Sequence, residues 1–319
     1  MITFGPIPSR RLGRSLGINN IPPKICTYSC VYCQVGRTIR MQADRHSFYK
    51  PEEILRAVAE KANKVREVGE AIDYLTFVPD GEPSLDTNLG REIDLLKPLG
   101  FKIAVITNAS LLWREDVRCD LLKADWVSLK VDAVSEKIWY KVNRPHRALQ
   151  FSAILNGMIE FASNYDGEIT TETMLVKGIN DRPEQAGGIA DFLSQLEPNK
   201  TYVSVPTRPP AESWVQPPNE TVINAFYQIL SRTVKNVEYL VSYEGNAFAF
   251  TGNVEEDLLS VTAVHPVTAD AVEELLRKAR SDWSRIQGLI DQALLLEIEY
   301  HGKKFYVRKF PQKQMRCEC

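Results

Sequence analysis

The sequence lacks several features that are typical of membrane proteins, secreted proteins and common metalloenzymes. Its 319 residues include no apolar run near the length of about 20 residues that crosses a bilayer, and no signal peptide. Its four histidines form no zinc-binding or catalytic set, since they are scattered at His46, His146, His265 and His301. We therefore expect a cytoplasmic protein whose chemistry depends on other side chains.

The chain also has little net charge, −2 at pH 7, but its basic residues concentrate at both ends. Residues 1–50 contain eight Lys or Arg against a single acid, Asp44, and residues 303–319 contain six against Glu318. Such segments can bind an anionic partner, such as RNA or a phosphorylated small molecule. The alternative is an ordinary solvated basic surface, and the sequence leaves both open.

Three of the six cysteines lie together near the amino end. Cys26, Cys30 and Cys33 form a Cys-x-x-x-Cys-x-x-Cys loop, and the aromatic Tyr32 directly precedes the last thiol. Three thiolates from one loop suit a cubane iron-sulfur cluster with one iron left open to bind a substrate. The alternative is structural zinc, but no second Cys or His pair follows at the spacing of a zinc ribbon. Without any sign of export, clustered thiols indicate a metal site rather than disulfides.

This loop resembles the motif of the radical S-adenosylmethionine (radical SAM) enzymes. The resemblance implies that Cys26, Cys30 and Cys33 hold a 4Fe-4S cluster and that S-adenosylmethionine (SAM) binds to its open iron. It also implies that one electron from the cluster cleaves this cofactor to a 5′-deoxyadenosyl radical, which abstracts hydrogen from a substrate. The chain lacks a flavodoxin-like domain, so we expect an external electron donor of the flavodoxin or ferredoxin type.

Short apolar runs alternate with stretches of helical length along most of the chain. We expect strands at residues 15–19, 74–78, 102–107, 126–131, 171–176 and 202–205. We expect helices from Pro51 onward and over 154–161 and 186–196. This alternation predicts an α/β fold with parallel strands and helical crossovers. Six such units make a partial (β/α)6 TIM-like barrel, the architecture that the resemblance implies, with its chemistry at the carboxyl ends of the strands.

The segment Asp80-Gly81-Glu82-Pro83 follows the second predicted strand. It looks like the glycine-glycine-glutamate element of the family, with Asp80 where the first glycine usually stands. Gly81 would allow close approach of the methionyl end of SAM, and Glu82 can accept a hydrogen bond from the ammonium of SAM. The residues that we expect to contact SAM are Tyr32, Gly81, Glu82, Pro83, Thr107, Asn108, Ser128 and Lys130.

The strand expected at 126–131 carries polar residues on one face. Ser128, Lys130 and Asp132 alternate with apolar residues, so the polar face should point into the barrel. Ser128 matches the position at which related enzymes hold the ribose or carboxylate of SAM. Asp132 and, beyond the last strand, Arg208 are candidate substrate contacts. The alternatives are a buried Lys130–Asp132 ion pair and, for Arg208, a rigid proline-rich surface loop.

Longer stretches narrow the resemblance within the superfamily. Residues 128–133, 142–145 and 174–181 are similar to the radical SAM enzymes that build the wyosine base in tRNA, and 174–181 also looks like the enzyme that begins molybdenum-cofactor synthesis. Residues 4–17 resemble more closely a group of radical SAM proteins related to the wyosine enzymes. The likeness covers roughly residues 1–210 and implies the cofactor chemistry rather than the substrate.

The remaining cysteines depart from the patterns of these relatives. No cysteine precedes Cys26 to hold a second cluster of the wyosine type. Cys317 and Cys319 offer two ligands at most, so we expect a redox-active or unstructured thiol pair rather than an auxiliary cluster. Cys119 is expected to be a buried helix residue.

The carboxyl-terminal residues 251–319 are expected to form a small domain after a radical SAM barrel domain of residues 1–250. Their pattern consists of helical stretches near 272–279 and 286–293 and alternating strands at 296–300 and 305–308. With a His301–Gly302 turn between the strands, this order predicts a winged helix followed by a basic, cysteine-containing tail. Winged helices are common in nucleic-acid binding.

Taken with the wyosine resemblance and the basic ends, these features predict a radical SAM enzyme that modifies a tRNA or other RNA base. One alternative is radical modification of a protein, peptide or small metabolite that docks on the winged helix. Another is a non-enzymatic iron-sulfur regulator that senses redox state and binds nucleic acid. No membrane is expected to take part.

Overall fold

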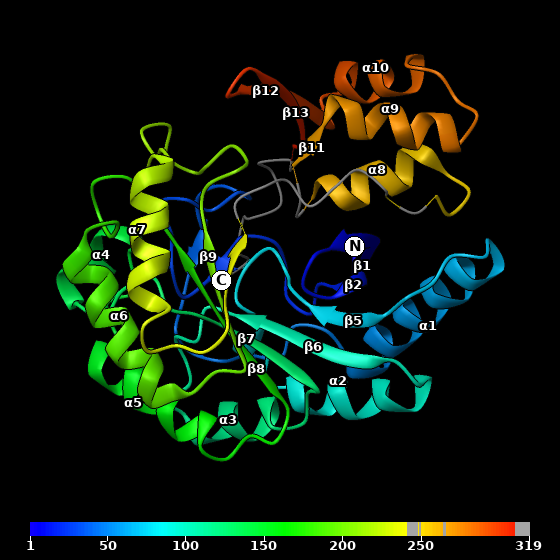
Figure 1. The fold of residues 1–319 in the computed structure, drawn as a ribbon. Coiled ribbons are helices and arrows are strands. Elements are labelled where there is room, and N and C mark those ends of the chain that lie inside the picture. Colours follow the sequence, from blue (N-terminus) through cyan, green and yellow to red (C-terminus); the bar gives the residue numbers. More distant parts are fainter. Residues whose placement is uncertain (241–247, 249, 264–265, 310–319) are drawn as a thin grey trace.

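The computed structural model describes residues 1–240, 248, 250–263 and 266–309. Within these residues, an eight-stranded sheet has the order β1-β2-β5-β6-β7-β8-β9-β10 (Figure 1). All neighbouring strands are parallel except β1 and β2, which are antiparallel. The strands are β1 (Thr3–Ser9), β2 (Gly13–Ile18), β5 (Tyr74–Phe77), β6 (Lys102–Thr107), β7 (Trp126–Lys130), β8 (Glu168–Met174), β9 (Lys200–Ser204) and β10 (Val237–Leu240).

The six expected strands are all present, as β2 and β5 to β9, so the mostly parallel α/β sheet is confirmed. Each of these six strands is followed by a helix, as the six predicted units require, and the described part of the sheet also contains β1 and β10. β1 carries Pro6 and Pro8, which argue against a strand in a sequence but are tolerated at a sheet edge. β10 has four residues, of which Glu238 and Tyr239 are exposed, so it shows no apolar pattern.

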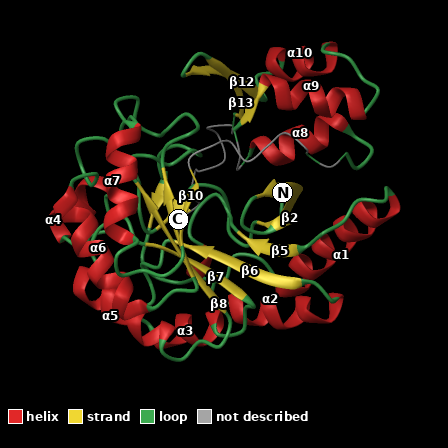
Figure 2. Cartoon of the chain, in the orientation of Figure 1, coloured by secondary structure: helices red, strands yellow, loops and turns green. Residues whose placement is uncertain are grey.

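Helices cover the outer side of the sheet (Figures 1 and 2). They are α1 (Pro51–Glu67), α2 (Leu89–Leu96), α3 (Glu115–Leu121), α4 (Glu136–Val142), α5 (Phe151–Ala162), α6 (Pro183–Leu196) and α7 (Glu220–Leu230), with 3-10 turns η1 (Pro83–Leu85) and η2 (Lys97–Leu99). The predicted start of α1 at Pro51 is confirmed, and Ile54 and Val58 are buried in the main core, which stabilises the fold by about 1.5–3 kcal/mol for each side chain. None of the helices in the described ranges is long and apolar enough to cross a bilayer.

One cysteine prediction is wrong in its burial. Cys119 lies in α3, as expected of a helix residue, but it is exposed. Val117 and Leu121 form the buried stripe of α3, and position 119 is two residues from each of them. Two residues are about half a helical turn, so Cys119 faces away from the core.

The inner side of the sheet is apolar near the amino ends of its strands and polar near the carboxyl ends. Leu12, in the turn between β1 and β2, packs with Ala104 and Trp126 and closes the amino end. Along β7, Val127 is buried in the outer core, whereas Lys130 lines an internal cavity. The polar side chains of the strands therefore meet at the carboxyl edge of the sheet.

The carboxyl-terminal elements form a second, smaller unit. They are α8 (Val254–Thr262), β11 (Val267–Thr268), α9 (Ala269–Lys278), α10 (Ser284–Asp291), β12 (Leu295–Tyr300) and β13 (Lys303–Arg308). The three strands form an antiparallel sheet in the order β11-β13-β12. The predicted hairpin is confirmed, with Tyr300 opposite Lys303 and positive φ angles at His301 and Gly302 in the turn. Cys317 and Cys319 lie outside the described residues.

This smaller unit, defined here as the described residues from 254 to 309, packs against the first strand of the large sheet. Phe4 and Ile7 of β1 belong to the same hydrophobic cluster as Leu258 and Val261 of α8. In Figure 1 the unit accordingly lies beside the amino-terminal strand. The hairpin also reaches the large sheet, since Tyr300 donates a hydrogen bond to the carbonyl oxygen of Pro206 at 3.4 Å.

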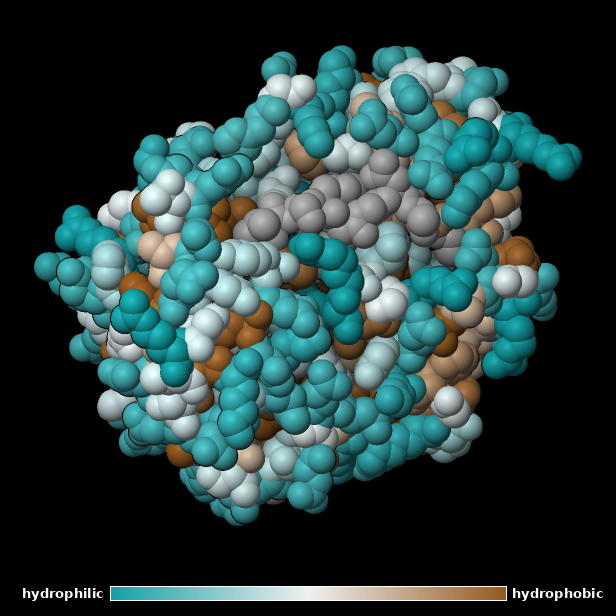
Figure 3. Space-filling view, viewed as in Figure 1, coloured by the Kyte–Doolittle hydropathy of each residue, from teal (hydrophilic) through white to brown (hydrophobic). Residues whose placement is uncertain are grey.

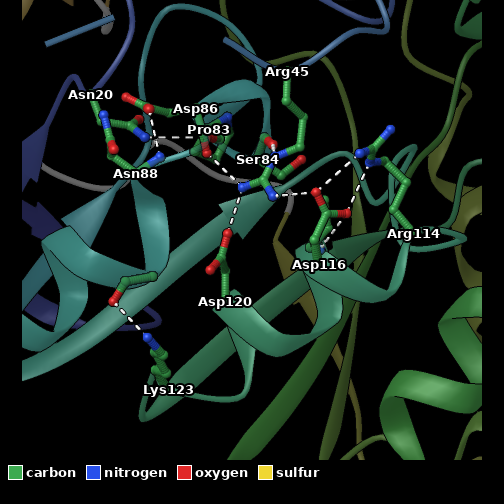
Figure 4. Close-up of polar contacts among 12 residues, drawn as sticks. Asn20, Arg45, Pro83, Ser84, Asp86, Asn88, Arg114, Asp116, Asp120 and Lys123 are labelled. Atoms are coloured by element: carbon green, nitrogen blue, oxygen red, sulfur yellow. Dashed lines mark hydrogen bonds and ion pairs between the residues drawn. The ribbon is translucent and has the colours of Figure 1, made fainter. Parts of the chain in front are cut away.

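Basic residues near the amino end are largely engaged by carboxylates. Arg45 is the most connected: it forms ion pairs with Asp116 at 2.9 Å and Asp120 at 2.5 Å and donates to the carbonyl oxygen of Ser84 (Figure 4). Other ion pairs of this segment are Arg11–Glu172, Arg14–Glu70, Arg14–Asp73, Lys24–Asp80 and Arg37–Glu212. At least five of the eight basic residues counted in residues 1–50 therefore have acidic partners, which lowers the positive charge that this segment can offer to an anion.

Candidate active site

The cysteine loop lies at the carboxyl edge of the sheet. Cys26 ends the short strand β3 (Ile25–Cys26), which pairs with β4 (Arg40–Met41) and closes the base of the loop. Cys26, Cys30 and Cys33 are half-buried and all line one cavity of about 340 Å³. The ends of β8 and β9 contribute Met174 and Ser204 to the same wall. The structure thus brings the three predicted ligands together where parallel α/β folds place their chemistry.

The described residues do not form a ready-made ligand set for a single metal ion. Within the described ranges, no three His, Cys, Asp or Glu side chains converge as the ligands of one metal ion do. Thiolates on one zinc ion lie about 4 Å apart, because each Zn–S bond is about 2.3 Å long. In a cubane cluster each thiolate binds a different iron, so a wider arrangement is needed.

Burial keeps these thiols protonated when no metal is bound. It raises the pKa of Cys26 and Cys33, and burial together with the nearby Asp132 raises the pKa of Cys30 to about 12. Since thiolates are the ligands, metal binding must release these protons. Amide groups already lie at two sulfurs: Asn108 Nδ2 is 3.5 Å from Cys26 Sγ, and Asn143 Nδ2 is 3.4 Å from Cys30 Sγ.

Gly81 lets the loop after β5 pass directly beside the cysteine loop. A Cβ atom at this position would lie 1.9 Å from the carbonyl oxygen of Ile25, so no other residue fits without a shift of the backbone. The amide of Lys24 donates to the carbonyl oxygen of Asp80 at 2.7 Å, and Lys24 Nζ lies 3.5 Å from the carboxylate of Asp80. The aspartate that replaces the usual glycine is therefore accommodated by an ion pair.

Glu82 links the ends of two strands. Its carboxylate accepts two hydrogen bonds from Ser84, from the backbone amide at 3.0 Å and from the hydroxyl at 2.5 Å. It also accepts from the Thr107 hydroxyl at 2.6 Å and from the backbone amide of Asn108 at 2.7 Å. The residue is 1% exposed. In this arrangement the carboxylate holds the loop after β5 against the end of β6.

The other predicted SAM contacts divide into two groups. Tyr32, Gly81 and Lys130 line the cavity. Pro83, Thr107, Asn108 and Ser128 are not part of its wall, and neither is Glu82. The hydroxyl of Ser128 is buried and has no hydrogen-bond partner among the described residues. These four residues and Glu82 therefore lie outside the wall of the cavity.

Two charged residues of the cavity, Arg11 and Glu172, are absent from the sequence-based site. Arg11 Nη1 lies 2.9 Å from Glu172 Oε2, and Lys130 Nζ lies 3.2 Å from Glu172 Oε1. Burial alone would raise the pKa of Glu172, but Lys130 and Arg11 lower it to about 2. Glu172 therefore stays ionised between two cations. In the sequence, Glu172 is two residues from Thr170 and from Met174, which places the three side chains on the same face of a strand. This spacing does not tell whether that face lies on the inner or the outer side of the sheet.

The two predicted substrate contacts lie in different surroundings. Asp132 is buried and lies outside the wall of the large cavity. Its carboxylate accepts hydrogen bonds from the Tyr32 hydroxyl, from the side-chain amide of Asn143 at 2.8 Å and from the backbone amide of Met174 at 2.9 Å. Its 3.7 Å contact with Lys130 matches the ion pair considered as an alternative. Arg208 lines the cavity and donates to Gln34 Oε1 at 3.0 Å.

A clamp from the loop after β9 fixes the outer side of the cysteine loop. Glu212 accepts two hydrogen bonds from Arg37, at 2.9 and 2.8 Å, and one from Arg144 at 2.5 Å. The amide of Glu212 also donates to the carbonyl oxygen of Val31 at 3.1 Å. Three segments far apart in the sequence are thereby joined around the thiols.

Comparisons with known proteins show the family to which the chain belongs. Residues 20–187 match the model of the radical SAM superfamily. A UPF0026 protein of Methanocaldococcus jannaschii is 48% identical over 314 residues, which cover 98% of this chain and 97% of that protein. Among solved structures, a radical SAM methyltransferase from Sphaerobacter thermophilus is similar with a TM-score of 0.56 and 18% identity, over 72% of this chain and 67% of that one.

A structure of TYW1 with a lysine-pyruvate adduct bound is similar with a TM-score of 0.52 and 15% identity, over 69% of this chain and 74% of that one. At this identity the likeness concerns the fold alone. The superfamily match confirms the prediction of an enzyme that uses SAM and an iron-sulfur cluster, and it gives no support to a non-enzymatic regulator. The chain belongs to the radical SAM superfamily and, within it, to the UPF0026 family.

Proposed function

We propose that Cys26, Cys30 and Cys33 hold a 4Fe-4S cluster in the large cavity and that SAM binds there beside it. The observation that carries the proposal is that three thiols of one loop line a single cavity together with Gly81 and Lys130. When bound, the two groups would supply a 5′-deoxyadenosyl radical by one-electron reductive cleavage of SAM. The electron comes from an external donor of the flavodoxin or ferredoxin type.

The protein's own residues have separate tasks around this cavity. SAM is contacted by Tyr32, Gly81 and Lys130, because these residues form part of the wall of the cavity. Glu82 acts mainly by holding the loop after β5 against β6, since its carboxylate oxygens already accept four hydrogen bonds. Arg208 contacts the substrate at the cavity wall.

Anaerobic reconstitution with iron and sulfide tests the cluster and its ligands. The wild-type protein should bind about four irons, show the EPR signal of a reduced cubane and convert SAM to 5′-deoxyadenosine under dithionite. Replacing any one of Cys26, Cys30 or Cys33 by Ala should abolish that product. Cys119→Ala is the matched control, because Cys119 is exposed and outside the cavity, and it should behave as wild type. A wild-type protein that binds only zinc contradicts the proposal.

For the substrate, we propose a tRNA or other RNA base that docks on a carboxyl-terminal domain of residues 251–319, next to a barrel domain of residues 1–250. The order helix, strand, helix, helix, hairpin, with the sheet order β11-β13-β12, supports a winged-helix domain. Tyr300 beside the hairpin turn contacts Pro206, which lines the cavity. The exposed Lys303 and Lys304 lie next to this contact and are suited to a phosphate backbone.

The second candidate is a protein, peptide or small metabolite. It is favoured by the ion pairs of Arg11, Arg14, Lys24, Arg37 and Arg45, which reduce the positive charge near the amino end. The face shown in Figure 3 bears on how such a partner binds: hydrophilic side chains dominate it, and hydrophobic patches are small and separate. On that face, a partner would have to be recognised through polar contacts.

Binding of total tRNA at several salt concentrations separates the two candidates. If RNA docks on the hairpin, Lys303→Glu with Lys304→Glu should weaken binding and reduce its salt dependence. The matched control is Lys137→Glu with Lys141→Glu, which makes the same charge change on the exposed side of α4. Equal binding by both double variants contradicts RNA docking on this hairpin and favours the second candidate.

A further inference from the structure

The side chain of Asn108 is fixed in one orientation by three contacts. Its Oδ1 accepts a hydrogen bond from the Ser110 amide at 3.0 Å, so its Nδ2 must be the atom that faces the cysteine loop. Nδ2 donates to Thr27 Oγ1 at 2.8 Å and lies 3.5 Å from Cys26 Sγ. An amide nitrogen has two hydrogens, and here one is used by an oxygen and the other by a sulfur.

Asn143 repeats this arrangement at a second cysteine. Its Nδ2 lies 2.8 Å from Asp132 Oδ2, and an ionised carboxylate can only accept, which fixes the orientation of the amide. The same Nδ2 lies 3.4 Å from Cys30 Sγ. Asn143 is 3% exposed. Its backbone carbonyl oxygen accepts a hydrogen bond from the backbone amide of Ser29 at 3.0 Å, so the residue is held against the cysteine loop.

Among the described residues, side-chain amides lie at the sulfurs of Cys26 and Cys30 and at no other sulfur of the loop. At Cys33, burial raises the pKa of the thiol, and the backbone amides of Val35 and Gly36 act in the opposite direction. Two of the three sulfurs therefore have a side-chain amide donor that comes from another element, one after β6 and one after α4. Because these donors are side chains, they can be removed without changing the backbone of the loop.

We propose that Asn108 and Asn143 are positioning residues that donate hydrogen bonds to two sulfur ligands of the cluster and raise its reduction potential. The inference rests on the proposed function, since it requires the cluster. Reduction adds negative charge to the cluster and its thiolates, so a fixed N–H donor stabilises the reduced state more than the oxidised state. The added electron comes from the external donor, and no bond in the protein is made or broken.

This role differs from the one that the sequence indicates for Asn108, namely contact with SAM. A residue that contacts SAM should change SAM affinity and leave the potential of the SAM-free cluster unchanged. A donor to the sulfur should change that potential even when no SAM is present. A redox titration without SAM therefore distinguishes the two roles.

The experiment is an EPR-monitored redox titration of the reconstituted, SAM-free protein. Asn108→Leu and Asn143→Leu keep the approximate side-chain size and remove the donor, and each should shift the midpoint potential to a more negative value. The double variant should show a larger shift than either single variant. Ser110→Ala is the matched control, because it removes the 2.7 Å hydrogen bond between Ser110 and Thr27 in the same loop contact but no donor to sulfur. Its potential should equal that of the wild type.

A wild-type measurement covers the case in which a Leu variant fails to fold or to load the cluster. In protein labelled with ¹⁵N at asparagine, pulsed EPR of the reduced cluster should show coupling to asparagine nitrogen. Absence of this coupling overturns the inference, as does an unchanged potential in fully loaded Leu variants. A wild-type protein that takes up no cluster at all would instead overturn the proposed function, and this inference with it.

Discussion

The inner side of the large sheet and the smaller carboxyl-terminal unit use charged residues to different extents. Inside the sheet, Arg11, Lys130 and Glu172 form ion pairs whose side chains are all less than one-sixth exposed, at 12%, 13% and 10%. In the smaller unit the interior is mainly hydrophobic, with Leu258, Leu275 and Ile286 among its members, and a single buried ion pair joins its Asp257 to Lys61 of α1 among the described residues. Its hairpin carries the exposed ion pair between Lys304 and Glu297 on the surface.

This difference shows which region is built for chemistry and which for packing. Burying charges costs free energy even when they are paired, so a protein that only needed stability would cover the inner side of the sheet with apolar side chains. The charged interior lies in the wall of the same cavity as the three thiols. The smaller unit, by contrast, gains most of its stability from apolar burial, and its buried Asp257 pairs with Lys61 of α1 away from the cavity.

The largest expected effect comes from breaking the charged interior. Glu172→Ala leaves the cations of Arg11 and Lys130 buried without their shared partner, and should lower the free energy of unfolding by about 3–5 kcal/mol. Urea denaturation checks this value. Lys304→Ala is the control, because it removes the exposed ion pair with Glu297, leaves the hydrogen bond from Tyr306 to Glu297 in place and should change stability little. Similar losses in the two variants would contradict the contrast drawn between the regions.

The next effect concerns the apolar unit. Leu258 is 1% exposed and lies in the cluster that joins α8 to β1, so Leu258→Ala should cost about 3 kcal/mol. Hydrogen exchange should show the loss first in α8, α9 and the hairpin. The control is Leu296→Ala on the hairpin, where the side chain is 41% exposed. Cluster loading should be unchanged in both variants, and a loss of iron on Leu258→Ala would mean that the two regions are not independent.

The sequence predicted those parts of the fold that follow from local pattern. Alternation of apolar residues and helical spacing were enough for the six central strands, for α1 and for the hairpin of the smaller unit. The edge strands were not predictable in this way, because β1 contains prolines and β10 is short and exposed. Their place in the sheet depends on partners that are distant in sequence. The packing of α8 on β1 is likewise a tertiary contact that no local pattern contains.

In the candidate site, too, the features that depend on local sequence were predicted and those that depend on distant residues were not. The cysteine spacing and Gly81 were recognisable because their chemistry depends on neighbours within one loop. The pairing of Arg11 with Glu172 joins residues 161 positions apart, and depends on the turn between β1 and β2 reaching β8 on the inner side of the sheet. Asn143 could be found as part of a familiar stretch, but its contact with Cys30 required the structure.

Lowering the pH should remove the stability contribution of Glu172 gradually, without a substitution. The pKa of Glu172 is about 2 in the folded protein, below its ordinary value of 4.5, because Lys130 and Arg11 outweigh the effect of burial. A carboxyl whose pKa is lowered by folding adds stability at pH above its unfolded value, and this stability disappears as the pH falls through the folded value. The stability difference between wild type and Glu172→Gln should therefore be constant above about pH 5 and shrink from about pH 4.5 towards pH 2.

The exposed carboxylate of the hairpin provides the comparison for that profile. Lys304 lowers the pKa of Glu297 as well, but solvent and salt screen this pair. The difference between wild type and Glu297→Gln should stay small at every pH. A profile for Glu172→Gln as flat as that of Glu297→Gln would show that the interior charges are solvated in solution.

Glu212 is intermediate between the buried Glu172 and the exposed Glu297. Its substitution should have the smallest effect on the free energy of unfolding. Its own side chain is 8% exposed, but those of its partners Arg37 and Arg144 are 69% and 41% exposed. Since its partners can be solvated when the bond is lost, Glu212→Gln should leave global stability close to that of the wild type. The amide of Glu212, which donates to Val31, should exchange its hydrogen faster because the clamp on the cysteine loop is weaker. A global loss as large as that of Glu172→Ala would mean that side-chain burial alone, rather than burial of both partners, decides the strength of an ion pair in this protein.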